Sequence, residues 1–193
     1  QAITLTGTTV PAWANFVDVG TGSGVLSGTP ENSDVGTHNV VITAADASGT
    51  TSTQTFTITV ANVNDAPTVT SAIADASTAE DASYSLNAAS AFTDVDSGDS
   101  LTYTMSGAPS TLSISSGTIS GTPINANVGA HTIVVTATDG SNAAVSDTFI
   151  LTVTNTNDAP TVTNTIADVS TAEDTTYSLN ESKNFAEVDT GKT

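Results

Sequence analysis

The chain repeats itself with a constant period of 93 residues, and this repetition constrains its fold more than any other feature. The segment Asn64-Asp65-Ala66-Pro67 returns as Asn157-Asp158-Ala159-Pro160, and Gly28-Thr29-Pro30 returns as Gly121-Thr122-Pro123. A spacing this constant along the whole chain does not arise by chance. The sequence is therefore built from tandem copies of one unit.

The repeat divides the chain into one complete unit and two partial ones. Residues 67–159 form the complete unit. Residues 1–66 match its later two-thirds and lack its first strands, and residues 160–193 match its first third. The first unit also carries about seven extra residues around Val17–Gly24.

Within a unit the pattern predicts β-strands. Apolar side chains alternate with threonine from Thr55 to Val60, and Phe149, Leu151 and Val153 recur at every second position in the same way. A period of two marks half-buried strands. Turns rich in Gly, Asn, Asp and Ser, such as Asp139–Asn142, separate the strands about every 8–12 residues. We expect an all-β chain of tandem immunoglobulin-like or cadherin-like β-sandwiches, with about seven strands per repeat.

The charge of the chain excludes several function classes. It has 20 acidic residues and two basic ones, Lys183 and Lys192, for a net charge of −18. Nucleic-acid binding needs cationic side chains that neutralise phosphates, and the same charge opposes docking on anionic membranes. No apolar run reaches the ~20 residues of a transmembrane helix, and no signal peptide is visible. We expect a soluble piece of a larger protein, without membrane insertion.

Neither cysteine chemistry nor catalysis is indicated by the residues. The absence of cysteine rules out disulfides and thiolate zinc sites, and no Gly-x-Ser-x-Gly nucleophile elbow occurs. His38 and His131, at equivalent positions of the repeat, are interpreted as strand residues. Trp13 is interpreted as a packing residue, with a sugar-stacking role as the alternative. We predict that the chain is not an enzyme.

Fourteen of the 20 acidic residues keep the register of the repeat. They form seven pairs at the 93-residue offset: Asp46 and Asp139, Asp65 and Asp158, Asp75 and Asp168, Glu80 and Glu173, Asp81 and Asp174, Asp94 and Glu187, and Asp96 and Asp189. Acids placed at random for solubility would not keep this register. We interpret most of them as structural parts of the unit.

The residue types in these motifs favour calcium. Calcium takes six to eight hard oxygen ligands. Residues 94–99 present alternate carboxylates in a turn, and residues 62–65 and 155–158 add amide and carboxylate oxygens at the linkers. Softer metals are disfavoured because nitrogen and sulfur ligands are missing. The alternative is a solvated acidic surface, which suits Asp75 and Asp168 better than a metal site does.

The motifs together resemble the dystroglycan-type cadherin-like (CADG) repeats of large bacterial surface adhesins. The resemblance covers the whole chain and rests on Ala79-Glu80-Asp81, Phe92-Thr93-Asp94-Val95-Asp96, Ile119-Ser120-Gly121-Thr122-Pro123, Ala137-Thr138-Asp139-Gly140 and Asn155-Thr156-Asn157-Asp158-Ala159-Pro160. In that family, as in cadherins, calcium sits between consecutive domains. The resemblance therefore implies Ca²⁺ as the cofactor.

The resemblance also implies which residues hold the ion at each junction. The first junction is expected to use Asn64, Asp65, Asp94, Asp96 and Asp139. The second is expected to use Glu80, Asn157, Asp158, Glu187 and Asp189. Asp46 should face an upstream junction, and Glu173, the counterpart of Glu80, is a further candidate ligand.

One loop departs from the cadherin pattern. Cadherins add an acidic pair in the loop after the Gly-Thr-Pro region. This loop holds Glu31 and Asp34 in one unit but Ile124 and Asn127 in the next. The number of ions at the second junction is left open by this difference.

The expected function is a calcium-stabilised structural repeat of an extracellular adhesin or surface filament, acting as a stiff extender in a secreted bacterial surface protein. Its partners would be neighbouring repeats or other copies of itself, bound head to tail. One alternative is a calcium-dependent module that binds cell-surface glycans or proteins, or adheres to its own kind. Another is an accessory domain of a secreted hydrolase.

The two partial units allow two interpretations. Residues 160–193 could pair with residues 1–66 of a neighbouring copy, which would be head-to-tail strand complementation. Alternatively, the sequence is an arbitrary section of a longer continuous chain. The residues alone leave both open.

Overall fold

The computed structural model describes residues 2–180 and 184–189, and strands dominate it. The chain separates into two compact units, Gln1–Asp65 with Val95–Gly98, and Ala66–Asp94 with Asp99–Thr193. The predicted all-β class is confirmed. No helix in the described residues is long and apolar enough to cross a membrane. The predicted repeat boundaries at 66 and 159 stay predictions.

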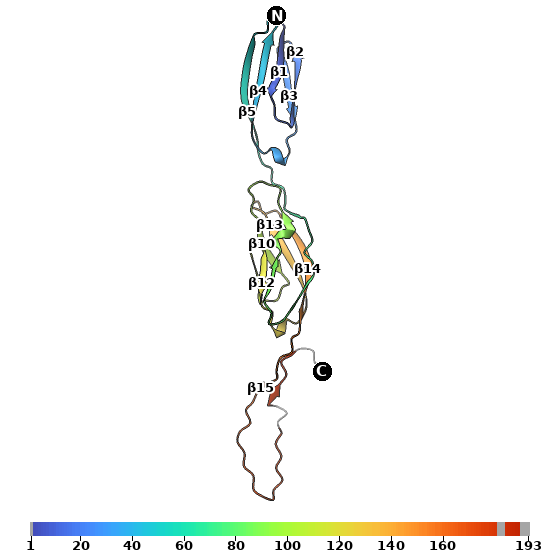
Figure 1. Cartoon of the computed structure of the whole chain (residues 1–193), viewed down its shortest axis with the longest axis vertical. Coiled ribbons are helices and arrows are strands. Elements are labelled where there is room, and N and C mark those ends of the chain that lie inside the picture. Colours follow the sequence, from blue (N-terminus) through green and yellow to red (C-terminus); the bar gives the residue numbers. More distant parts are fainter. Residues whose placement is uncertain (1, 181–183, 190–193) are drawn as a thin grey trace. The chain divides into compact units, whose positions relative to one another are not determined.

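The first unit combines a three-stranded sheet, in the order β1-β4-β5, with the hairpin β2-β3. Figure 1 shows β4 and β5 running side by side, as their continuous antiparallel register from Gly36↔Val60 to Ala45↔Thr51 requires. The elements are β1 (Ile3–Thr9), β2 (Ala14–Gly20), β3 (Ser23–Gly28), the 3-10 turn η1 (Asn32–Asp34), β4 (Gly36–Asp46) and β5 (Thr51–Val60).

The β2-β3 hairpin is longer than its counterpart in the second unit. It spans residues 14–28, which is 15 residues, whereas the hairpin β11-β12 spans residues 112–121, which is ten. The insertion is thus five residues rather than about seven. Asp18 lies on it, and its carboxylate accepts hydrogen bonds from Leu5 N and Gly20 N, each at 2.9 Å. These bonds tie the hairpin to β1 and lower the pKa of Asp18.

Among its described residues, the second unit holds seven strands of four or more residues, which agrees with the number expected for one repeat. They form a four-stranded sheet in the order β10-β13-β14-β7 and a three-stranded sheet in the order β11-β12-β8. The elements are β6 (Thr68–Val69), β7 (Ala76–Ala79), β8 (Tyr84–Asn87), η2 (Ala89–Ala91), β9 (Phe92–Thr93), β10 (Thr102–Ser106), β11 (Leu112–Ser115), β12 (Thr118–Gly121), η3 (Asn125–Asn127), β13 (Gly129–Thr138) and β14 (Ala144–Thr154).

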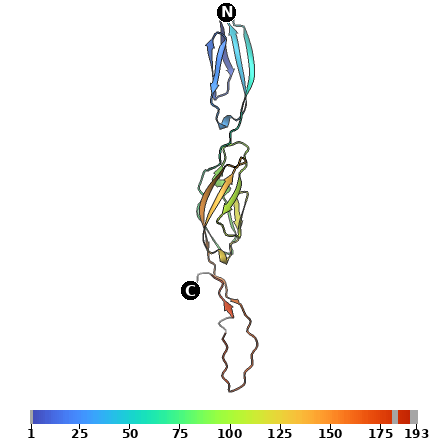
Figure 2. The same ribbon diagram turned by 180° about the vertical axis from the view of Figure 1, so that it is seen from behind.

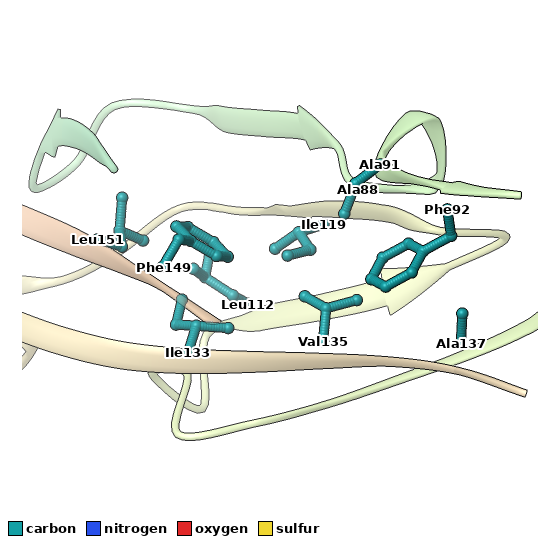
Figure 3. Packing of buried hydrophobic residues seen from close by; sticks show 10 residues of the cluster. All are labelled: Ala88, Ala91, Phe92, Leu112, Ile119, Ile133, Val135, Ala137, Phe149 and Leu151. Carbon is teal, nitrogen blue, oxygen red and sulfur yellow. The ribbon is translucent and has the colours of Figure 1, made fainter. Parts of the chain in front are cut away.

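The hydrophobic core of the second unit lies between these two sheets (Figure 3). Along β14, Phe149, Leu151 and Val153 are buried while the residues between them are exposed, as the predicted period of two requires. Further core residues come from the two sheets, namely Leu112, Ile119, Ile133, Val135 and Ala137, and the segment around η2 and β9 adds Ala88, Ala91 and Phe92. Burial of each large apolar side chain contributes about 1.5–3 kcal/mol to stability.

The repeated Gly-Thr-Pro motif has a steric cause. A Cβ atom at Gly28 would collide with the carbonyl oxygen of Trp13, and one at Gly121 with the carbonyl oxygen of Thr111. Gly121 also has a φ of +152°, which other residues rarely adopt. Only glycine therefore allows this close approach of the two hairpin strands in both units.

The last described segment reproduces only the outermost pairing of a repeat. Strand β15 (Thr161–Val162) pairs with β16 (Phe185–Ala186), as β6 pairs with β9. Between them, residues 163–180 form no strand and run as an extended trace in Figures 1 and 2. Whether residues 160–193 pair with residues 1–66 of another copy stays a prediction.

The core assignment can be tested with two adjacent residues of β14. Leu151→Ala should lower the free energy of unfolding by about 2–5 kcal/mol, because Leu151 is fully buried and the truncation leaves a cavity. Ile150→Ala should change it by about 0.5 kcal/mol, because Ile150 is 42% exposed. Urea unfolding, monitored by circular dichroism of the backbone, measures the free energy of unfolding of both variants. Equal losses for the two variants would contradict the placement of the core.

Candidate metal centre

Glu80 is held inside the protein by its own backbone. Strand β7 runs parallel to β14, with Ala79 opposite Thr154. Just beyond this pair, Glu80 N donates to Thr154 O at 2.9 Å and Asp81 N donates to Pro123 O at 2.8 Å. The chain turns sharply here, since Asp81 has a φ of +59°. As a result the Glu80 side chain points inward and is only 2% exposed.

The linker that follows β14 passes beside this glutamate. Thr156 N donates to Glu80 Oε1 at 2.8 Å. Two residues later, Asp158 N donates to Asp189 Oδ1 at 2.9 Å. Asn157 Nδ2 donates to Asp158 O at 3.0 Å. The linker thus brings carboxylates from three distant parts of the chain into one place.

The first cluster consists of Glu80, Asp158 and Asp189, whose carboxylate oxygens lie within 4.8 Å of one another. Oε2 of Glu80 is buried, and it accepts no hydrogen bond from the described residues. A buried charge without a partner is costly. A hard cation would remove that cost, and an oxygen-only donor set with three negative charges suits calcium. The residues present therefore fit the ion that the sequence predicts.

A second cluster lies just beyond the last residue of strand β13. Carboxylate oxygens of Asp94, Asp99 and Asp139 lie within 4.8 Å of one another, and Asp139 is 4% exposed. Asp139 Oδ1 accepts hydrogen bonds from Ser141 N at 2.9 Å and Ala143 N at 2.8 Å, so the turn after β13 fixes its position. Asp94 and Asp139 are predicted ligands. Asp99 was not among the predicted ligands, although it is the last residue of the predicted acidic turn.

The linker geometry recurs in the first unit. Asp65 N donates to Asp96 Oδ2 at 2.8 Å, as Asp158 N donates to Asp189 93 residues later. Asn64 Nδ2 donates to Asp65 O at 3.0 Å, as Asn157 does to Asp158. Asp96 is 6% exposed. The predicted ligands Asp65 and Asp96 therefore meet each other, in the same arrangement as their counterparts.

Comparison with known proteins assigns the chain to a family. The family model described as a putative Ig domain matches residues 1–61 and, separately, residues 66–154. The chain belongs to this putative Ig domain family.

The curated relatives of this Ig-domain chain are bacterial adhesins. Proteins named "Serine-rich adhesin for platelets" from Staphylococcus aureus strains MRSA252 and MSSA476 are 37% identical over 150 residues, which is 76% of this chain. The chain spans only 10% and 6% of their respective lengths. The similarity therefore concerns a small part of each adhesin.

Solved structures confirm a cadherin-like fold for the Ig-domain chain. Human mucin-like protocadherin EC1-2 matches with a TM-score of 0.61 at 16% identity, over 80% of this chain and 84% of that chain. Mouse cadherin-23 EC22-24 matches with a TM-score of 0.61 at 19% identity, over 84% and 57%. An endo-fucoidan hydrolase of glycoside hydrolase family 107 matches at 25% identity over 80% and 24%, but its TM-score of 0.41 carries no conclusion.

Seven predicted ligands of the Ig-domain chain lie outside both clusters of the described residues. Four of them, Asn64, Asp65, Asp96 and Asn157, make the linker contacts described above, and the other three are Glu187, Glu173 and Asp46. Glu187 Oε1 accepts hydrogen bonds from Val188 N and Asp189 N, at 3.0 and 3.1 Å, and so folds back on its own backbone. Glu173 is exposed. Asp46 Oδ1 accepts from Ser48 N and Thr50 N, each at 2.9 Å, and the side chain shapes the turn after β4.

The loop after Gly-Thr-Pro keeps one structural role in both units of the Ig-domain chain. Asp34 Oδ2 accepts a hydrogen bond from Glu31 N at 2.8 Å, and Asn127 Oδ1 accepts one from Ile124 N at 3.0 Å. Both side chains therefore close the same 3-10 turn. The change from Asp34 to Asn127 preserves this acceptor.

His38 and Trp13 pack against each other in the first unit. Their rings meet edge to face, with centroids 5.7 Å apart and an interplanar angle of 86°. His38 Nε2 lies 2.6 Å from Asp34 O, and His131 Nε2 lies 2.7 Å from Asn127 O. Both histidines sit on strands, as predicted, and support the 3-10 turn. That the chain is not an enzyme stays a prediction.

Asp46 provides a test by pH. Hydrogen bonds, first that of Ser48, lower the folded-state pKa of Asp46 below its ordinary 3.8. Its ionised form therefore stabilises the fold above pH 3.8, and this contribution is lost as the pH falls through the folded-state pKa. As the pH falls, Asp46→Asn should lose less stability than wild type. Urea unfolding at several pH values on either side of 3.8 measures this difference. Parallel pH profiles for the variant and wild type would refute the role of Asp46.

Proposed function

We propose that this chain is a calcium-stabilised structural repeat of an extracellular adhesin or surface filament, and that it acts as a stiff extender. The observation that carries the proposal is the buried Oε2 of Glu80, which accepts no hydrogen bond within the described part of the chain and lies beside the carboxylates of Asp158 and Asp189. Similarity to staphylococcal adhesins and the cadherin-like fold support the same function. We expect calcium rather than a softer metal at this site, because every ligand in the cluster is an oxygen.

Electrostatics explain why the cluster needs a cation. Two unit charges 4.8 Å apart repel by about 3 kcal/mol at an effective dielectric constant of about 20, and the cluster contains three such pairs. A bound calcium ion supplies two positive charges and accepts six to eight oxygen ligands. Glu80, Asp158 and Asp189 would each contribute a carboxylate oxygen. The affinity should lie in the extracellular range, on the order of 10⁻⁴–10⁻³ M.

The stiffening would arise because the three ligands belong to three different segments of the chain. Glu80 follows β7 of the complete repeat, Asp158 belongs to the linker, and Asp189 follows β16 of the next repeat. Ligands drawn together from these segments would stop rotation about the linker backbone. The cluster of Asp94, Asp99 and Asp139 would bind a further ion within the complete repeat. Spacer repeats of this kind hold a distant functional domain away from a surface.

Further parts of the proposal rest on the sequence motifs. We propose that the units are dystroglycan-type cadherin-like repeats, because the five motifs named above resemble that type. The expected location is the surface or surroundings of a bacterial cell, where calcium is abundant. The expected partners are neighbouring repeats and other copies of the chain.

An adhesive role is the second candidate function, and the 37% identity to adhesins for platelets favours it. In this case the chain would itself bind cell-surface glycans or proteins, or another copy of itself. A glycan array probed in calcium distinguishes the two candidates. Specific signals that disappear with chelator would support adhesion, and an empty array would support a passive spacer.

Glu80→Gln tests the ion site directly. The variant should bind calcium about tenfold or more weakly than wild type, because it removes one charged ligand. In chelator it should unfold at the same or a higher temperature than wild type, because it also removes carboxylate repulsion. Calorimetric titration and thermal unfolding measure the two effects.

The neighbouring Asp81→Asn is the matched control for this variant. It changes the same charge on an exposed residue outside both clusters, and asparagine tolerates the positive φ at this position. Its calcium affinity should equal that of wild type. If Glu80→Gln also binds calcium like wild type, Glu80 is not a ligand.

Small-angle X-ray scattering tests the stiff extender. Wild type in calcium should give a narrower distribution of interatomic distances near the maximum than wild type in chelator, because the linker loses rotational freedom. Glu80→Gln should resemble the chelator state at intermediate calcium. Identical wild-type profiles with and without calcium would count decisively against rigidification.

A further inference from the structure

A neutral side chain contacts the linker aspartate in both units. Asn32 Nδ2 donates to Asp65 Oδ2 at 2.9 Å, and Asn125 Nδ2 donates to Asp158 Oδ2 at 3.2 Å. Donors and acceptors are both 93 residues apart, so this is the same hydrogen bond in two copies of the repeat. The residues around the two asparagines differ, since Glu31 is replaced by Ile124 and Asp34 by Asn127.

Asn125 makes a second contact that joins two segments. Its Nδ2 also donates to Val188 O at 2.6 Å, and an amide nitrogen carries two hydrogens for two such acceptors. Val188 precedes Asp189, which belongs to the first cluster. Asn125 therefore holds the linker aspartate and the backbone next to the third carboxylate at the same time.

The turn that carries each asparagine is itself well supported. Asn125 starts η3, which is closed by the Ile124 N to Asn127 Oδ1 bond and braced by His131. Asn32 starts η1, which is closed in the same way by Asp34 and braced by His38. A donor on a supported turn loses little conformational entropy when it binds an acceptor. Both asparagines are therefore fixed points against which a linker aspartate can be oriented.

We propose that Asn125 is a positioning residue for the calcium site, and that Asn32 has the same role for Asp65. The inference rests on the proposed function. Asn125 satisfies Oδ2 of Asp158 and docks the 188–189 segment, so that the carboxylates of Asp158 and Asp189 stand together before any cation arrives. Such an arrangement reduces the ordering cost of binding. Because the donor is a neutral amide, it opposes carboxylate repulsion without competing for the ion.

The experiment compares Asn125→Ala with Ser120→Ala, an exposed position on β12 outside the site. Calcium affinity is measured by calorimetric titration of the full chain. Asn125→Ala should bind calcium about 10- to 100-fold more weakly, the usual cost of losing a residue that orients a ligand. Ser120→Ala should match wild type. In chelator, hydrogen exchange of the Asp158 amide should be faster in Asn125→Ala than in wild type, because its acceptor Asp189 is no longer docked.

Asn125→Asp is a second variant that keeps the volume of the side chain. It replaces the donor by a charged acceptor facing Asp158, and should bind calcium at least as weakly as Asn125→Ala. If this variant binds calcium as tightly as wild type or more tightly, the proposal is overturned. Calcium affinity would then depend on the charge at position 125 and not on the hydrogen bond that the Asn125 amide donates. Unchanged affinity in Asn125→Ala with a lower unfolding temperature in chelator would also overturn it and assign Asn125 to folding alone. Wild type that binds no calcium would instead refute the proposed function.

Discussion

The antiparallel ladder between β13 and β14 supports everything else in the second unit. Its ten register pairs run from Gly129↔Val153 to Thr138↔Ala144, and its inner face supplies much of the core. The turn at one end of this ladder fixes Asp139, and the linker leaves from the other end toward Asp158. Both acidic clusters are therefore placed by one pair of strands. β7 completes the arrangement, since its pairing with β14 carries Glu80 to the start of the linker.

The fold was largely predictable because its signals are local. A period of two identified β5 and β14, and the number of long strands in the complete unit agrees with the expected seven. The first cluster was also predictable, since the family resemblance implies Glu80, Asp158 and Asp189 as ligands at the same junction. The length of the β2-β3 hairpin was overestimated, because an insertion within irregular Gly-rich sequence has no periodic signal to align.

The remaining site residues depend on geometry that the sequence does not express. Asp99 has Lys192 at the 93-residue offset, so comparison between repeats could not identify it, and only loop closure brings it to Asp139. Glu187 keeps the charge of Asp94, but its carboxylate accepts hydrogen bonds from the amides of Val188 and Asp189. Asn125 keeps the register through Asn32 but carries no charge, so a search among acidic residues passes over it.

The parallel pairing of β7 with β14 has a mechanical consequence. The chain enters the complete repeat shortly before β7 and leaves it directly after β14. Tension along the chain pulls these two strands in opposite directions along their common axis. The four register pairs from Leu151↔Ala76 to Thr154↔Ala79 are then loaded in shear and share the force, whereas strands peeled apart from one end would break their bonds singly. A repeat whose first long strand pairs in parallel with its last one therefore resists stretching at the strands to which the pulling force is applied.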